Sequence, residues 1–210
     1  ILADPPYGVG ADNWTSKFED NPHLYKDNWK YASEIYAAIA TYGFMASKPR
    51  SNLMMFCDIS KWHLVRDIAE ACGWTTWLHP LIWHKSNEGI RPWSERGYAY
   101  CYEAILFATK GQKGLIKTGP DVITGINKVR DREHGAAKPP ALYSLLIEST
   151  SLPGSRVLDP CCGSGTIFRA ATMSNVIATG MENDKVYIGL SQEALRETFR
   201  EVTADQLEAF

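Results

Sequence analysis

The sequence predicts an α/β protein with one hydrophobic core arranged around a largely parallel sheet. Three observations predict this fold class. The 210 residues are 45% hydrophobic, which is enough for one sizeable core. Short apolar runs alternate along the chain with stretches of helical spacing, and several apolar runs end at a polar or turn-forming residue. We therefore expect a single domain over residues 1–210.

The first half of the chain predicts alternating strands and helices. Residues 1–3 are typical of the end of a buried strand, and two prolines stop it because proline fixes φ and donates no backbone N–H. Residues 8–30 are polar with scattered aromatic side chains, which predicts a long loop. Next we expect a helix with Tyr31, Ile35, Ile39 and Tyr42 on one face and Gly43 at its end, a strand at 53–57, and a helix marked by Trp62, Val65, Ala69 and Cys72 and closed by Gly73.

The second half continues the alternation. Residues 77–83 and 104–108 predict two strands with a polar loop at 86–98 between them. Residues 110–133 are basic, contain several glycines and lack clear periodicity, so they predict another loop. The remaining elements are a helix that Pro139 opens in its first turn, strands at 156–159 and 176–181, and helices from Ile167 and over Val186–Phe199.

Composition excludes several classes of protein. The five cysteines show no repeated metal-ligand spacing and no disulfide framework, so we expect a reducing, cytoplasmic compartment and no metal site. No apolar run approaches the length of a membrane span. The chain begins without methionine inside an apolar run, which is typical of a piece of a longer product.

The formal net charge of −2 means that the surface as a whole does not attract a polyanion. Any contact with nucleic acid must therefore come from a local basic patch. Between residues 110 and 138, three acids face seven basic residues, namely Lys110, Lys113, Lys117, Lys128, Arg130, Arg132 and Lys138. This segment could meet phosphate, although a charge run is more often only a solvated face.

A glycine turn lies between a predicted strand and a predicted helix at Gly163-Ser164-Gly165. Glycine there allows a ligand to approach the backbone closely and leaves the amides of the helix start available. Glu182 ends the next strand about 20 residues later, where doubly wound folds place an acid on a ribose hydroxyl pair. The pair indicates a nucleoside-containing cofactor, and the lack of a lysine after the glycines disfavours a phosphate loop.

The motif Asp4-Pro5-Pro6-Tyr7 ends the first predicted strand. An exocyclic base amine is a poor nucleophile because its lone pair is delocalised into the ring. The Asp4 carboxylate and the Pro5 carbonyl, held rigid by Pro6, could accept its two N–H groups and favour the reactive nitrogen. Tyr7 would stack on a base removed from the duplex. The alternative is a strand-ending turn whose aspartate caps a backbone group.

With both motifs in this order, the chain resembles the β class of DNA amino-methyltransferases. Residues 4–7 match the catalytic DPPY, residues 159–166 resemble DPFxGSGT, and residues 180–184 resemble GIExD. The resemblance assigns cofactor binding to Asp159, Pro160, Cys161, Gly163, Ser164, Gly165, Thr166, Glu182 and Asn183, together with His134, Lys138 and Pro139 of the preceding segment. Cys161 stands where the family usually has phenylalanine. A cysteine nucleophile is rejected for it because it lies in the cofactor turn.

The resemblance implies a Rossmann-like fold for methyltransferases that use S-adenosyl-L-methionine. In that fold a mixed seven-stranded sheet of order 3-2-1-4-5-7-6 carries helices on both faces, and the motif order is circularly permuted. The third strand, at one edge, has no counterpart in this sequence, which predicts a sheet that lacks it. We also expect Asp4 and the glycine turn to face each other across one cleft.

The implied activity is site-specific methylation of adenine N6 in DNA, of the restriction-modification type. Open alternatives are cytosine N4, adenine in RNA, and a non-catalytic cofactor-binding subunit of a larger complex. The expected partner is a DNA duplex with a flipped base, or a single strand, and the chain could also form a homodimer or join a partner subunit. For Lys85, Arg91, Arg96 and Trp14 a solvated or loop-packing side chain is an equal alternative to a DNA contact. The full set of predicted DNA contacts is Lys85, Arg91, Arg96, Trp14, Lys128, Arg130 and Arg132.

Overall fold

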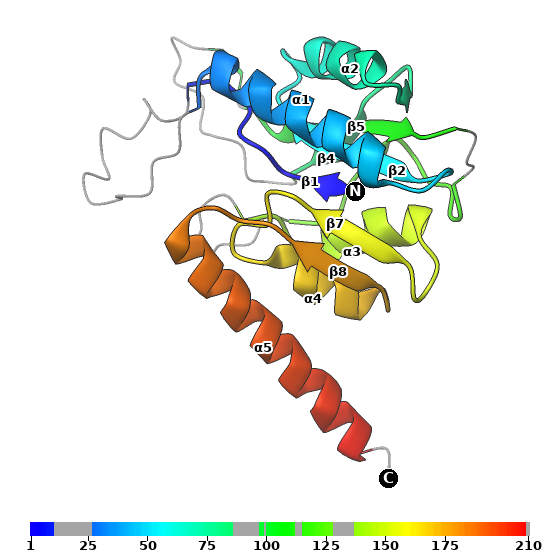
Figure 1. Ribbon diagram of the computed structural model, residues 1–210, viewed down its shortest axis with the longest axis vertical. Coiled ribbons are helices and arrows are strands. Elements are labelled where there is room, and N and C mark those ends of the chain that lie inside the picture. Colours follow the sequence, from blue (N-terminus) through cyan, green and yellow to red (C-terminus); the bar gives the residue numbers. More distant parts are fainter. Residues whose placement is uncertain (11–26, 86–96, 99, 112–114, 128–136, 209–210) are drawn as a thin grey trace. The chain divides into compact units, whose positions relative to one another are not determined.

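The structure is a computed structural model that describes residues 1–10, 27–85, 97–98, 100–111, 115–127 and 137–208 (Figure 1). The chain forms two compact units, and each unit combines segments from distant parts of the sequence. The first unit contains Ile1–Ala3, His84–Tyr102 and Gly114–Phe210. The second unit contains Asp4–Trp83 and Glu103–Lys113.

The second unit is organised around strand β5 (Tyr102–Thr109). β5 lies between β2 (Asn52–Cys57) and β4 (Leu81–His84), and the short β3 (Thr75–Thr76) also pairs with it. β2 runs antiparallel to β5, in a register from Asn52 opposite Thr109 to Cys57 opposite Ala104. All six residues of β2 are buried, as expected for a strand covered on both faces.

Helices α1 (Trp29–Ala46) and α2 (Trp62–Ala71) pack against each other in this unit. The Tyr36 hydroxyl donates a hydrogen bond of 2.9 Å to the Phe56 carbonyl, which fastens α1 to β2. The Trp74 indole N–H donates to the Ala40 carbonyl at 2.8 Å, and the Trp74 ring meets Phe44 edge-on. These bonds satisfy the polar atoms of aromatic side chains that the packing buries.

Two expectations for this unit were wrong in detail. Gly43 does not end α1; it lies buried inside the helix, which continues to Ala46. The buried face is Ala32, Tyr36, Ile39, Ala40 and Gly43, whereas Tyr42 is 69% exposed. Small residues on this face permit close packing, which outweighs the roughly 1 kcal/mol that glycine costs inside a helix. The strand expected at 77–83 is the shorter β4, because residues 77–80 adopt no strand before Leu81.

The first unit contains the parallel pair β7 (Arg156–Asp159) and β8 (Ile177–Gly180), whose register runs from Arg156 opposite Ile177 to Asp159 opposite Gly180. Strand β1 (Leu2–Ala3) lies beside β7. Among the described strands, β8 pairs with β7 alone. The strand predicted at 156–159 is confirmed in both bounds.

Helix α4 (Thr166–Met173) packs against α3 (Pro140–Thr150), α5 (Lys185–Glu208) and β8. Figure 1 shows α5 as one continuous helix, in orange to red, that extends well past the predicted end at Phe199. α3 starts one residue later than predicted, since Pro139 is its N-cap and Pro140 its first residue. The short β6 (Val122–Ile123) interrupts the loop expected at 110–133.

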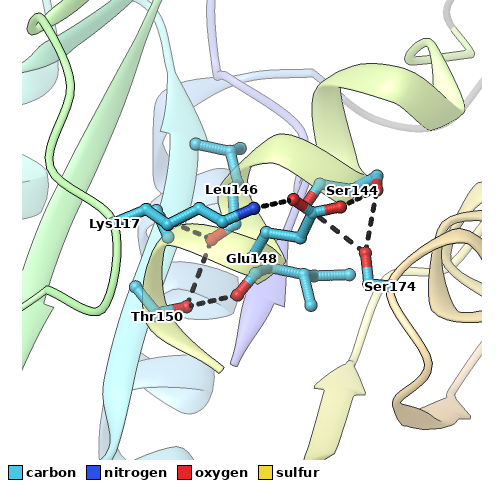
Figure 2. Close-up of polar contacts among 8 residues, drawn as sticks. Lys117, Ser144, Leu146, Glu148, Thr150 and Ser174 are labelled. Atoms are coloured by element: carbon cyan, nitrogen blue, oxygen red, sulfur yellow. Dashed lines mark hydrogen bonds and ion pairs between the residues drawn. The ribbon is translucent and has the colours of Figure 1, made fainter. Parts of the chain in front are cut away.

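A polar cluster joins α3 to the end of α4 (Figure 2). The hydroxyls of Ser144 and Ser174, both buried, lie 2.8 Å apart, and Ser144 also donates to Glu148 at 3.2 Å. Lys117 forms an ion pair of 2.6 Å with the other oxygen of Glu148, and this pair lowers the pKa of the Glu148 carboxyl. Because the pair is solvent-exposed, we attribute the helix contact mainly to the buried serines.

Across the described part of the chain, every helix is too short or too polar to span a bilayer.

Candidate active site

The motif at residues 4–7 belongs to the second unit and is tied to strand β5. The Tyr7 hydroxyl lies 2.9 Å from Asp4 Oδ1 and 2.7 Å from Glu103 Oε2. Asp4 and Tyr7 are partly buried, and Pro5 is buried. The predicted Asp4 and Tyr7 are therefore in direct contact, and Glu103, which the sequence did not single out, joins them.

The surroundings of Tyr7 keep its hydroxyl protonated. Burial raises the pKa of Tyr7 well above its ordinary value, and the negative charges of Asp4 and Glu103 raise it further. At neutral pH the side chain is a neutral hydrogen-bond donor with an aromatic face. This state suits stacking on a base and disfavours a role for Tyr7 as a general base.

Asp27 holds the backbone that follows the motif. Its Oδ1 accepts from the Gly8 N–H at 2.6 Å, its Oδ2 accepts from the Val9 N–H at 3.2 Å, and its carbonyl accepts from the Gly10 N–H at 2.7 Å. Asp27 is only 1% exposed. Gly8 has a φ of +72°, and a side chain there would come within 2.8 Å of the Trp29 Cα, so glycine is required. The sequence placed Asp27 in a polar loop, and nothing in the local pattern marked it as buried.

We expect Asp27→Ala to lower the free energy of unfolding by about 3 kcal/mol, because it leaves buried backbone N–H groups without their charged acceptor. Urea denaturation followed by circular dichroism measures this change. Asp67→Ala is the matched control, since Asp67 is an exposed aspartate on α2 of the same unit. If Asp27→Ala lowered the free energy of unfolding no more than the control does, the stabilising role of the Asp27 hydrogen bonds would be contradicted.

The glycine turn lies in the first unit, between the end of β7 and the start of α4. Gly163 and Gly165 have φ of +50° and +88°, a region that residues with side chains rarely adopt. A side chain at Gly163 would meet no atom within 4 Å, whereas one at Gly165 would lie 3.0 Å from both the Ser191 Cα and the Phe168 ring. Gly165 is thus needed for packing, and Gly163 leaves open space beside the turn.

Two acids at the carboxyl ends of β7 and β8 bind the backbone of this turn. Asp159, 1% exposed, accepts from the Cys161 N–H at 3.0 Å. Glu182 Oε2 accepts from the Gly163 N–H at 2.9 Å, and its Oε1 accepts from the N–H groups of Asn183 and Asp184 at 2.8 and 2.9 Å. The structure therefore brings together the glycine turn and the acid that the sequence paired with it.

The segment before α3 meets the same turn. The Thr166 hydroxyl donates to the Lys138 carbonyl at 3.3 Å, and both residues are buried. Pro139 follows as the N-cap of α3. Pro160, Cys161 and Ser164 are partly buried around the turn. Lys138 and Pro139 thus lie beside the predicted cofactor residues.

Cys162 of the turn is not a nucleophile. Cys162 is buried, and burial, followed by the charges of Asp159 and Glu182, raises the pKa of its thiol to about 12. A thiol in this state stays protonated at neutral pH. The chemistry of Cys162 therefore supports a packing role, and the described residues contain no group of three His, Cys, Asp or Glu that could hold a metal ion.

The predicted DNA contacts are for the most part not described. Trp14, Arg91, Arg96, Lys128, Arg130 and Arg132 lie outside the described residues, as does His134, which was predicted for the cofactor site. Lys85 follows β4, and its backbone N–H donates to the Cys101 carbonyl at 2.7 Å. Two members of the basic segment have structural partners: Lys110 Nζ donates to the Phe44 and Ser47 carbonyls at the end of α1, and Lys117 pairs with Glu148.

Comparison with known proteins gives a consistent family. The family model N6_N4_Mtase, described as DNA methylase, matches residues 1–193. The type II methyltransferase M.HpaI of Haemophilus parainfluenzae is 25% identical over 231 residues, an alignment that covers 95% of this chain and 68% of that protein.

Solved structures share the fold. The M1.HpyAVI–SAM complex has a TM-score of 0.68 at 22% identity, covering 93% of this chain and 87% of that one. The PvuII DNA methyltransferase, which is cytosine-N4-specific, has a TM-score of 0.71 at 12% identity, covering 92% and 77%. At these identities the likeness concerns the fold, and it confirms the predicted α/β methyltransferase architecture.

Proposed function

Because the chain belongs to the N6/N4 DNA methylase family, we propose that it transfers a methyl group from S-adenosyl-L-methionine to the exocyclic N6 of adenine in DNA. The observation that carries the proposal is the Asp4-Pro5-Pro6-Tyr7 motif, whose aspartate is paired with a protonated tyrosine. The family comprises DNA methyltransferases that use this cofactor, and it includes both adenine-N6 and cytosine-N4 enzymes.

The residues of the motif act on the target amine. When bound, the cofactor supplies a methyl carbon made electrophilic by its sulfonium. The Asp4 carboxylate and the Pro5 carbonyl accept the two N–H groups of the amine, which localises the nitrogen lone pair for attack. In the transfer, the Asp4 carboxylate would take the surplus proton of the amine through this hydrogen bond as the nitrogen receives the methyl group. Tyr7 stacks on the base and holds it in line.

The glycine turn fits the cofactor. Open space beside Gly163 would admit the adenosyl group against the backbone, and Glu182 at the end of β8 would accept from the ribose hydroxyls. We propose that Asp159, Pro160, Cys161, Ser164, Gly165, Thr166 and Asn183 form the rest of this site, with His134, Lys138 and Pro139. Glu182 already binds three backbone N–H groups, so the ribose would share or replace these bonds.

Chain connectivity supports one reaction for both motifs. Asp4 follows Ala3, the last residue of β1, and β1 lies beside β7, which leads into the glycine turn. In open α/β sheets, ligands bind at the carboxyl ends of the strands. We propose that the catalytic motif and the cofactor motif take part in the same methyl-transfer reaction.

The aspartate in the first position of the motif favours adenine, because serine is typical of the cytosine enzymes that the chain resembles. Cytosine N4 remains the second candidate, since the same acceptors suit its amine and the fold is shared with a cytosine-N4-specific enzyme. DNA contacts by Lys85, Arg91, Arg96, Trp14, Lys128, Arg130 and Arg132 are part of this proposal, as is a role in restriction-modification.

Mass spectrometry of nucleosides tests the proposal. Unmethylated DNA of mixed sequence is incubated with the protein and cofactor, digested, and compared with an RNA of the same sequence. We expect N6-methyl-2′-deoxyadenosine from the DNA and no methylated nucleoside from the RNA. N4-methylcytosine would transfer the assignment to the second candidate, and a modified RNA would reassign the substrate.

A further inference from the structure

Glu103 occupies a distinctive place at the start of β5. Tyr102 before it is exposed and Ala104 after it is buried, so Glu103 lies where the strand enters the core. Its Oε2 is 2.7 Å from the Tyr7 hydroxyl, across 96 positions of sequence. A partly buried carboxylate in this position loses hydration and therefore needs a hydrogen-bonding partner.

The Tyr7 hydroxyl has one proton but lies between two carboxylate oxygens, those of Asp4 and Glu103. Its position is therefore set by both acids together. A change in either carboxylate shifts the hydrogen bond of the Tyr7 hydroxyl toward the other acid, and the tyrosine ring moves with it. The contact to Glu103 is the shorter of the two, at 2.7 Å against 2.9 Å.

The two acids differ in how firmly the backbone holds them. Glu103 lies next to Ala104, which is paired with Cys57 in the six-residue ladder between β2 and β5. Asp4 follows a strand of only two residues, and residues 4–7 belong to no helix or strand. A rigid strand can locate a side chain more accurately than a loop can. Glu103 is thus the fixed point of the three residues.

We infer that Glu103 is a positioning residue: through the Tyr7 hydroxyl, it fixes the Tyr7 ring and aims the Asp4 carboxylate at the target amine. This inference rests on the proposed function, because aiming matters only if Asp4 receives a substrate group. Misplacement of a reacting group by about 1 Å can cost roughly 100-fold in rate. Glu103, which supports Asp4 through Tyr7 from strand β5, would prevent such a loss of rate.

The test uses Glu103→Ala, Glu103→Gln, Tyr7→Phe and the double variant Glu103→Ala/Tyr7→Phe in the full chain. We expect Glu103→Ala to lower kcat by about 10- to 100-fold with KM for the cofactor unchanged, because only alignment is lost. Glu103→Gln should retain most of the activity, since its amide oxygen still accepts from Tyr7. The double variant should be no slower than Tyr7→Phe, because both changes break the same chain of hydrogen bonds from Glu103 through Tyr7 to Asp4.

Glu34→Ala is the control, since Glu34 is an exposed glutamate on α1 of the same unit. Three results would each overturn the positioning role of Glu103. They are additive effects of Glu103→Ala and Tyr7→Phe, a wild-type kcat in Glu103→Ala, and a Glu103→Gln variant as slow as Glu103→Ala. A kcat loss that matches a fall in the folded fraction measured by circular dichroism would also overturn it. A wild-type chain that transfers no methyl would instead overturn the proposed function, and the role of Glu103 with it.

Discussion

Replacement of Asp4 by alanine is expected to lower methyl transfer by about 10³-fold or more while cofactor affinity stays close to that of the wild type. In the proposed mechanism the Asp4 carboxylate acts on the target amine, so its loss would leave that amine with a delocalised lone pair and one acceptor fewer. The proposal assigns cofactor binding to the glycine turn and Glu182 and not to Asp4, so we expect the affinity for the cofactor to change little.

Nucleoside mass spectrometry gives the transfer rate, and isothermal titration calorimetry gives the dissociation constant of the cofactor. Asp67→Ala, on the exposed surface of α2, should retain both properties. Parallel loss of transfer and of cofactor affinity in Asp4→Ala would assign Asp4 to folding or to the cofactor site. A rate within about 10-fold of wild type would remove Asp4 from the chemistry, because lost transition-state hydrogen bonds cost more.

Gly165→Ala is expected to lower the free energy of unfolding by about 3 kcal/mol or more, from backbone strain and overpacking together. Its φ of +88° is unfavourable for alanine, and the new Cβ would lie 3.0 Å from the Ser191 Cα, a backbone atom that cannot move aside cheaply. Gly163→Ala is the matched comparison. Its Cβ would meet no protein atom, so only the strain of φ +50° applies, about 1 kcal/mol.

The two glycines should therefore separate stability from binding. Urea denaturation measures the first, and calorimetry with the cofactor measures the second. We expect Gly163→Ala to remain folded but to bind the cofactor at least 10-fold more weakly, because the methyl group occupies the space proposed for the ligand. Equal stability losses in the two variants would contradict the packing argument, and unchanged affinity in Gly163→Ala would contradict the proposed cofactor position.

The sequence predicted well those parts whose structure depends on local chemistry. The strand at 156–159 has the predicted bounds because its apolar run is closed by Asp159 and Pro160, which begin a turn. The pairing of the glycine turn with Glu182 followed from a spacing that the βαβ connection imposes. The DPPY motif was predictable because its four adjacent residues supply both the hydrogen-bond acceptors and the aromatic ring that the proposed chemistry needs.

Features that depend on tertiary packing were not predictable from the sequence. The sequence predicts a helix end at Gly43, whose burial inside α1 follows instead from the close packing of a small-residue face. Glu103 contacts Tyr7 of the motif over 96 positions, and Asp27 contacts Gly8, just after the motif, over 19 positions; no local pattern reveals either contact. Lys110 was counted with a basic segment, although it caps the end of α1.

Transfer of a radiolabelled methyl group from the cofactor to DNA by the wild-type chain tests the central claim most directly. The assay needs only the chain, tritiated S-adenosyl-L-methionine and unmethylated DNA, with bound cofactor measured in the same sample. We predict label that stays with the DNA through acid precipitation and is recovered in a methylated base. Saturated cofactor binding without label in the DNA would contradict the account and indicate a cofactor-binding subunit that does not catalyse transfer.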